Sequence, residues 1–111
     1  MFEKNLELGY LLDFYGELLS ERKRTVMEMY YNEDLSLAEI ATEIGISRQG
    51  AHDIIKKSED ELLFFEEKLG LAQKLKNVSI KASELKAISC KLDLPNDFQE
   101  KLAELITTVE K

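Results

Sequence analysis

Apolar residues recur at three- and four-residue steps along most of this chain, and that spacing marks one face of an α-helix. Near the start, Leu8, Leu11, Leu12 and Tyr15 follow one another at these steps. The chain has one Pro and five Gly, so few positions are suited to turns. No stretch shows the alternation typical of a strand. The pattern predicts an all-α protein with helices over about residues 5–19, 21–32, 37–44, 48–75, 80–92 and 97–109.

The sharpest local signal lies between the third and fourth of these helices. Ser36 followed three residues later by Glu39 is a capping box, in which each side chain satisfies a backbone N–H of the other residue. A helix over residues 37–44 then ends at Gly45, which suits the left-handed conformation of a helix end. Ser47 is a second N-cap, and the next helix begins directly after it. This order of short helix, tight turn and second helix is typical of a helix-turn-helix.

The second helix of this motif buries small and branched apolar residues, so its polar residues point outward. An outward Arg can pair with guanine and Gln with adenine, while Lys pairs with phosphate. The predicted nucleic-acid-binding residues are Arg48, Gln49, His52, Lys56 and Lys57.

A second cluster of positive charge lies in the first turn of the helix over 21–32, where the helix dipole disfavours it. It is either a solvated face or a set of phosphate contacts. The hydroxyls of the two N-cap serines are further candidates. The predicted phosphate contacts are Arg22, Lys23, Arg24, Ser36 and Ser47.

The long helix after the turn has a seven-residue apolar repeat, typical of a helix seam. Its positions are Ile55, Ser58, Leu62, Phe65, Leu69 and Ala72, with Gly70 as the weak point of the helix. Within the seam, Leu62, Phe65 and Leu69 form either a dimer surface or the packing surface for the first or last helix. The acidic residues between them, from Glu59 to Glu67, are expected on the solvated side.

Asn77-Val78-Ser79 reads as a turn, so we expect two parts. Residues 1–75 form the helix-turn-helix domain, and residues 76–111 form a helical extension that packs on it or makes a dimer interface. The fold class is therefore a helix-turn-helix within a five- to six-helix domain, with a long helix after the turn.

Composition and charge change this picture in one respect. The 111 residues carry a net charge of −7, whereas a DNA-binding protein is expected to show a basic footprint. The charge is uneven, because residues 47–57 carry +2 while 1–46 carry −6, 58–68 carry −4 and 69–111 carry +1. Any basic footprint is therefore local and lies between acidic stretches.

Candidate chemistry is sparse. One Cys and one His, Cys90 and His52, exclude a disulfide framework and a zinc site of soft ligands. The chain has no glycine-rich phosphate loop and no nucleophile elbow. The sequence predicts no enzyme activity, no metal and no cofactor. It also shows neither a secretory signal nor an apolar run long enough to span a bilayer, so we expect a cytoplasmic protein without membrane insertion.

The stretch from Asp34 to Lys57, which reads DLSLAEIATEIGISRQGAHDIIKK, resembles region 4 of bacterial sigma-70-type factors. The whole chain resembles the YlxM-type family of small helix-turn-helix proteins. The residues that carry this likeness are LLDFYGELLS at 11–20, Met-Tyr-Tyr at 29–31 and FEEKLGL at 65–71. The resemblance covers about residues 5–72. It departs at Gly50, where such helices hold a better helix former, and at His52, where the family often has an aromatic residue.

The resemblance implies an all-helical fold with a helix-turn-helix of the region-4 type. It also implies a regulatory role linked to the signal recognition particle pathway. Three functions stay open from the sequence. The first is a DNA-binding regulator, expected to be a homodimer. The second is an acidic adaptor that binds a basic protein or ribonucleoprotein, including signal recognition particle components. The third is a sigma-like remnant that contacts RNA polymerase.

Overall fold

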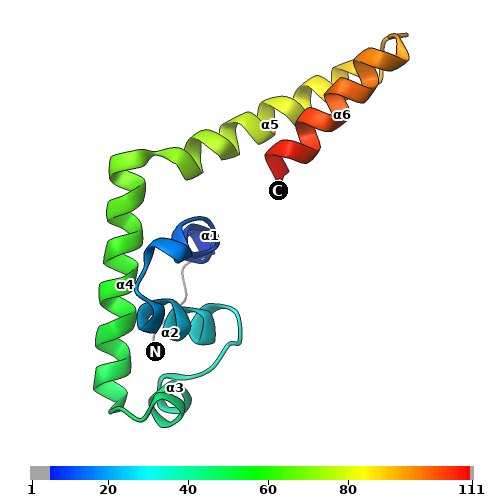
Figure 1. Ribbon diagram of the computed structural model, residues 1–111. Coiled ribbons are helices and arrows are strands. Elements are labelled where there is room, and N and C mark those ends of the chain that lie inside the picture. Colours follow the sequence, from blue (N-terminus) through cyan, green and yellow to red (C-terminus); the bar gives the residue numbers. More distant parts are fainter. Residues whose placement is uncertain (1–5, 111) are drawn as a thin grey trace. The chain divides into compact units, whose positions relative to one another are not determined.

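The structure is a computed structural model, and it describes residues 6–110 (Figure 1). All regular structure in this range is helical, which confirms the predicted all-α class. The elements are α1 (Leu6–Tyr15), a 3-10 turn (Gly16–Leu18), α2 (Glu21–Tyr31), α3 (Leu37–Ile44), α4 (Arg48–Leu69), α5 (Leu71–Ser89) and α6 (Asn96–Glu110).

The predicted helix boundaries are correct at the helix-turn-helix and, within one residue, at α6, but they are wrong between α4 and α5. α4 begins at Arg48 as expected, but it ends at Leu69 rather than near residue 75. Gly70 takes a left-handed conformation with φ of 62°, which glycine adopts without steric cost, and a new helix starts at Leu71. The turn expected at residues 77–79 is absent, because α5 runs unbroken through them.

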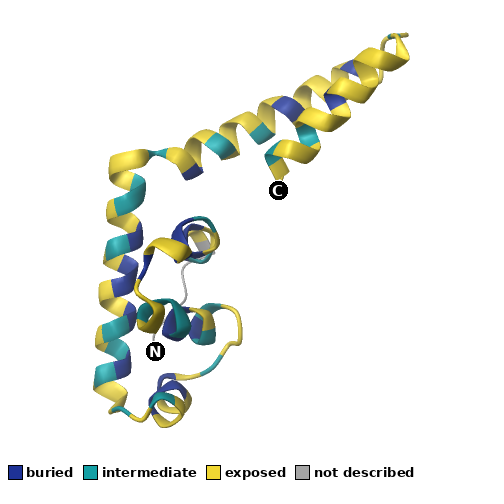
Figure 2. Ribbon diagram, viewed as in Figure 1, coloured by how far each residue is buried: buried dark blue, intermediate teal, exposed yellow. Residues whose placement is uncertain are grey.

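The chain consists of two compact units, Met1–Leu69 and Gly70–Lys111. The first unit contains the helix-turn-helix, with α1, α2 and α3 all in contact with α4. Figure 2 shows the buried positions of α4 along the side that faces these helices. The side chains of Met27, Ile40, Ile55 and Leu62 are fully buried there. α4 is therefore the helix against which the other helices of this unit pack to form its core.

The seam of α4 divides along its length. Ile55, Ser58 and Leu62 are fully buried inside the unit, as a helix-packing seam requires. Phe65 is half-buried, and its ring lies 6.0 Å from that of Tyr15 in α1. Leu69, at the end of the helix, is exposed. The part of the seam up to Phe65 therefore packs against the protein's own helices.

The second unit is a helical hairpin in which α5 and α6 lie against each other. Buried positions are few here, and the apolar ones among them are Ala72, Ala82 and Leu102. A shallow hollow between the two helices is lined by residues such as Ser89, Cys90 and Leu102. Among the described residues, no helix is long and apolar enough to cross a membrane.

Candidate nucleic-acid interface

Capping and a glycine turn fix the geometry of the helix-turn-helix. The backbone N–H of Ser36 donates to Glu39 Oε1 at 3.0 Å, and Glu39 N–H donates to Ser36 Oγ at 3.1 Å. These two bonds are the predicted capping box, and they start α3 at a defined residue. Hydrogen bonding to the backbone N–H of Ser36, and secondly to the Ser36 side chain, holds the pKa of the Glu39 carboxyl below its ordinary value.

The turn between α3 and α4 forms as the sequence predicts. Gly45 has φ of 83°, and both its N–H and that of Ile46 donate to the Ala41 carbonyl. Ser47 Oγ then accepts from the N–H of Gly50 at 2.9 Å, which caps α4. Ala41 and Ala51 are both buried, so small side chains line the two helices that meet at this turn.

The first three turns of α4 have one buried and one exposed side. Ala51 and Ile55 face the core. The exposed side holds four of the five predicted nucleic-acid-binding residues, and the fifth, His52, is half-buried. We call this exposed set the reading face; it comprises Arg48, Gln49, Asp53, Lys56 and Lys57.

Polar contacts within the reading face involve its acidic member. Asp53 Oδ1 accepts a hydrogen bond from Gln49 Nε2 at 3.0 Å and lies 3.8 Å from His52 Nδ1. Lys56 lies 3.9 Å from Asp60, one turn further along α4. Among the described residues, Arg48 and Lys57 form no ion pair. Two cations of the reading face are thus available to an external anion, while Gln49 already has an internal partner.

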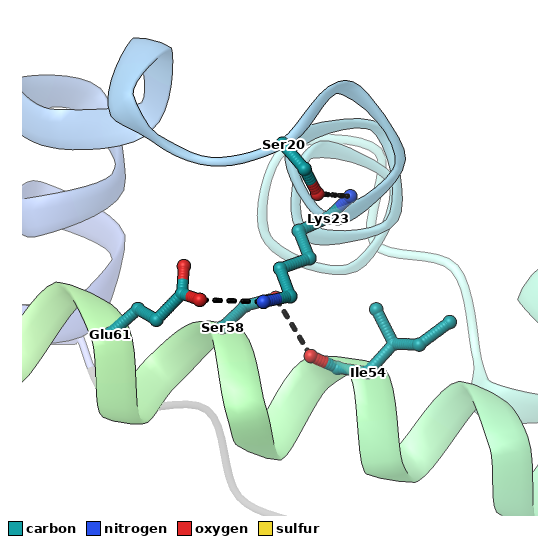
Figure 3. Close-up of polar contacts among 5 residues, drawn as sticks. All are labelled: Ser20, Lys23, Ile54, Ser58 and Glu61. Atoms are coloured by element: carbon teal, nitrogen blue, oxygen red, sulfur yellow. Dashed lines mark hydrogen bonds and ion pairs between the residues drawn. The ribbon is translucent and has the colours of Figure 1, made fainter.

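The cluster at the start of α2 is not a uniform set. Lys23 Nζ reaches across to Glu61 of α4 at 2.5 Å, as Figure 3 shows beside the N-cap of Ser20. Arg24 lies 3.9 Å from Glu28 within its own helix, whereas Arg22 is exposed. Lys23 therefore joins two helices, and Arg22 is the member of the cluster most open to solvent.

The acidic residues of α4 correct a prediction from the sequence. They were expected on the solvated side, and Asp60 and Glu67 are exposed as predicted. Glu59, however, is buried and accepts a 2.5 Å hydrogen bond from the Tyr31 hydroxyl. Glu66 accepts one from the Tyr15 hydroxyl at 2.6 Å. Glu61 is held by Lys23. The prediction failed because spacing along α4 does not reveal which neighbouring helix supplies a donor.

Tyr31 and Tyr15 are residues that sequence reasoning placed only in family or core patterns. Their hydroxyls donate hydrogen bonds to a buried and a half-buried carboxylate, and buried polar groups generally need such a partner. The neighbouring Tyr30 is buried as well, and burial, followed by the charges of Glu59 and Asp34, raises its pKa. Within residues 6–110, no group of His, Cys, Asp and Glu side chains is arranged to hold a metal ion.

Comparison with known proteins agrees with this architecture. A family model described as "Putative helix-turn-helix protein, YlxM / p13 like", named UPF0122, matches residues 2–105. The chain belongs to the UPF0122 family. The match extends well past residue 72, where the resemblance drawn from the sequence ended, so the second unit is part of the family pattern.

Relatives from several bacteria support the assignment to UPF0122. A UPF0122 protein of Bacillus cereus strain AH187 is 39% identical over 110 residues, covering 99% of this chain and 100% of the relative. A UPF0122 protein of Bacillus anthracis strain A0248 shows the same identity and coverage. One from Clostridium kluyveri strain ATCC 8527 is 50% identical over 76 residues, which is 68% of each chain.

Proposed function

We propose that this UPF0122 protein is a regulator that binds duplex DNA through the reading face of α4. The observation that carries the proposal is the exposed, positively charged first half of a helix that a capped helix-turn-helix holds in place. Such a helix fits the major groove, where Arg reads guanine and Gln reads adenine. A role on DNA implies a cytoplasmic location.

The distribution of acidic groups supports this proposal. A net charge of −7 opposes approach to phosphate. However, three acids of α4 have partners within the protein. Tyr31 donates to Glu59, Lys23 to Glu61 and Tyr15 to Glu66. The reading face itself holds three cations and one acid. The reading face therefore carries a local net charge of +2, although the total charge of the chain is −7.

Phosphate contacts have candidate donors outside the reading face. Arg22 is exposed at the start of α2, and the hydroxyls of Ser36 and Ser47 lie at the two helix starts of the motif. Each hydroxyl accepts a backbone N–H, which leaves its own proton to donate to an anion. We propose Arg22 and these serines as backbone contacts that set the register of α4.

The test is binding of the purified full chain to fluorescent random-sequence duplex across a salt series. Binding through phosphate contacts gives a logarithm of affinity that falls linearly with the logarithm of salt, by about 0.9 per neutralised phosphate. Lys56→Ala is expected to weaken binding to all sequences alike and to reduce that slope by about one unit. The absence of binding at low salt would overturn the proposal.

A matched control separates the reading face from a general charge effect. Lys101 of α6 is also an exposed lysine with a local carboxylate partner, Glu104 at 3.1 Å. Lys101→Ala changes the net charge by the same amount as Lys56→Ala but lies outside the helix-turn-helix. Equal losses in the two variants would show that net charge, rather than the reading face, governs binding.

An acidic adaptor that does not bind DNA is the second candidate function. The observation that favours it is the total charge of −7 together with Asp53, which occupies the middle of the reading face and accepts from Gln49. Such a surface suits a basic protein or a ribonucleoprotein, and the YlxM resemblance suggests signal recognition particle components. Retention of this protein on immobilised protein and RNA of the signal recognition particle, without DNA binding, would favour the adaptor function.

A further inference from the structure

The hairpin of α5 and α6 leaves apolar side chains exposed that a two-helix unit cannot cover. Figure 2 shows exposed positions along most of both helices. Large apolar side chains more than two-fifths exposed include Val78, Leu85 and Ile88 on α5, and Phe98 and Leu105 on α6. We call these five residues the hairpin face. A segment of roughly forty residues seldom has a sufficient core of its own without a staple or a partner.

Four members of the hairpin face lie on two stripes, one on each helix. Val78 and Leu85 are seven residues apart on α5, and so are Phe98 and Leu105 on α6, so each pair lies on one helix stripe. The stripes lie next to the buried positions Ala82 and Leu102. Because the two helices run antiparallel, both stripes turn to the same side of the hairpin.

The charges of the two helices indicate what covers this surface. α5 carries four Lys and one Glu, for a net charge of +3. α6 carries four acids and one Lys, for a net charge of −3. A two-fold axis through the hairpin face places α5 of one copy beside α6 of the other, and the same contact forms twice. Apolar packing and opposite charge then favour the same arrangement.

We propose that a second copy of this chain docks on the hairpin face, so that two hairpins form a four-helix bundle. The bundle would bury both exposed stripes, with knobs-into-holes packing of residues spaced at seven. This dimer differs from one through the α4 seam, because Leu62 is already buried within the first unit. The proposal does not depend on DNA binding.

The first test is the mass of the full chain in solution at micromolar concentration, by sedimentation equilibrium. We expect twice the chain mass of 12.8 kDa. Leu85→Glu places a charge in the middle of the hairpin face and is expected to raise the dimer dissociation constant by roughly tenfold or more. Leu63→Glu is the matched control, because Leu63 is also an exposed leucine but lies on α4. It is expected to leave the mass unchanged.

A second test removes the objection that Leu85→Glu simply unfolds the hairpin. One variant carries Lys74→Glu and Lys81→Glu on α5, and another carries Asp97→Lys and Glu104→Lys on α6. In a dimer of either variant alone, α5 of one copy and α6 of the other carry charges of the same sign. Each variant alone is therefore expected to dimerise more weakly. An equimolar mixture restores opposite charges and is expected to form mixed dimers preferentially.

Three outcomes would overturn the proposal. One is a single-chain mass for the wild type at all concentrations tested, because no second copy would then cover the hairpin face. Another is a dimer that Leu63→Glu disrupts and Leu85→Glu does not, which would assign the interface to α4. Random pairing of the charge-reversed variants would likewise contradict the α5–α6 contact.

Discussion

Gln49 donates its side-chain amide to Asp53 across one turn of α4, at 3.0 Å. Both residues lie on the reading face, so the side chain proposed to recognise adenine is already engaged by a neighbouring carboxylate. The same carboxylate adds negative charge where phosphates would approach. This pair therefore acts as an internal competitor for DNA.

The first prediction follows from that competition. Asp53→Ala removes the negative charge and frees the Gln49 amide, so affinity for duplex DNA is expected to rise by roughly tenfold, the size of one charge contact. The measurement is anisotropy at fixed low salt. Asp93→Ala, which removes an acid from the second unit, is the control and is expected to have a much smaller effect. Unchanged affinity in Asp53→Ala would argue against the reading face.

A second prediction separates two neighbouring cations of α2. Lys23 bridges to Glu61 at 2.5 Å with both side chains partly exposed, so Lys23→Ala is expected to cost at most about 1 kcal/mol of unfolding free energy after solvent screening. Arg22 is exposed, and Arg22→Ala is expected to leave stability unchanged while weakening DNA binding and its salt dependence. Urea unfolding and anisotropy measure the two effects. A larger loss of binding in Lys23→Ala than in Arg22→Ala would contradict this division.

The third prediction concerns the buried carboxylate of Glu59. Tyr31→Phe removes the hydroxyl that donates to it, so a buried acceptor loses a hydrogen bond. The expected cost is about 1–3 kcal/mol of unfolding free energy, measured by urea denaturation. If the bond is responsible, the double variant Tyr31→Phe with Glu59→Leu should be less destabilised than the sum of the two single variants, because no acceptor is then left unsatisfied.

The fourth prediction uses one substitution at two glycines with opposite results. Gly45 lies in the turn with φ of 83°, so Gly45→Ala is expected to destabilise the protein by about 1–2 kcal/mol. Gly9 lies within α1, and an added Cβ would meet Tyr31 Cδ1 at 3.6 Å, an ordinary contact. Gly9→Ala is therefore expected to stabilise by up to about 1 kcal/mol, from helix propensity. Thermal denaturation of both variants measures the difference, and a shift of the same sign in both would contradict the reasoning.

The success of sequence reasoning varied with the range of the interactions involved. The helix-turn-helix depends on contacts within a few residues, such as those of Ser36 with Glu39 and of Ser47 with Gly50, and its boundaries were predicted correctly. The bonds that position the acids of α4 join residues 28 to 51 positions apart, and no local pattern indicates them. The end of α4 also depended on the backbone conformation of Gly70, which composition alone leaves open.

The candidate site shows the same division. Periodicity identified the exposed side of α4 because buried Ala51 and Ile55 fix the helix orientation. It did not distinguish Lys23 from Arg22, since both lie in the same turn and only the position of Glu61 separates them. The predicted turn at residues 77–79 failed because Asn77, Val78 and Ser79 include no helix-breaking Gly or Pro, and a helix as long as α5 accommodates them.

The last prediction concerns acid sensitivity of the capping box. The bonds from Ser36 lower the pKa of Glu39 from its ordinary value of 4.5 in the folded state. A carboxylate whose folded pKa is depressed stabilises the fold above the unfolded pKa, and this stability is lost as pH falls through the folded pKa. Below about pH 4.5, therefore, part of the stability of α3 is expected to disappear.

Glu39→Gln removes the charge but keeps an acceptor for the Ser36 N–H, so it is expected to lower stability at neutral pH and to lose this part of the acid dependence. Urea midpoints of both proteins at neutral and acidic pH measure the effect, with Glu43→Gln, an exposed site on the same helix, as control. Parallel pH profiles for the wild type and Glu39→Gln would show that the capping box does not carry the acid dependence.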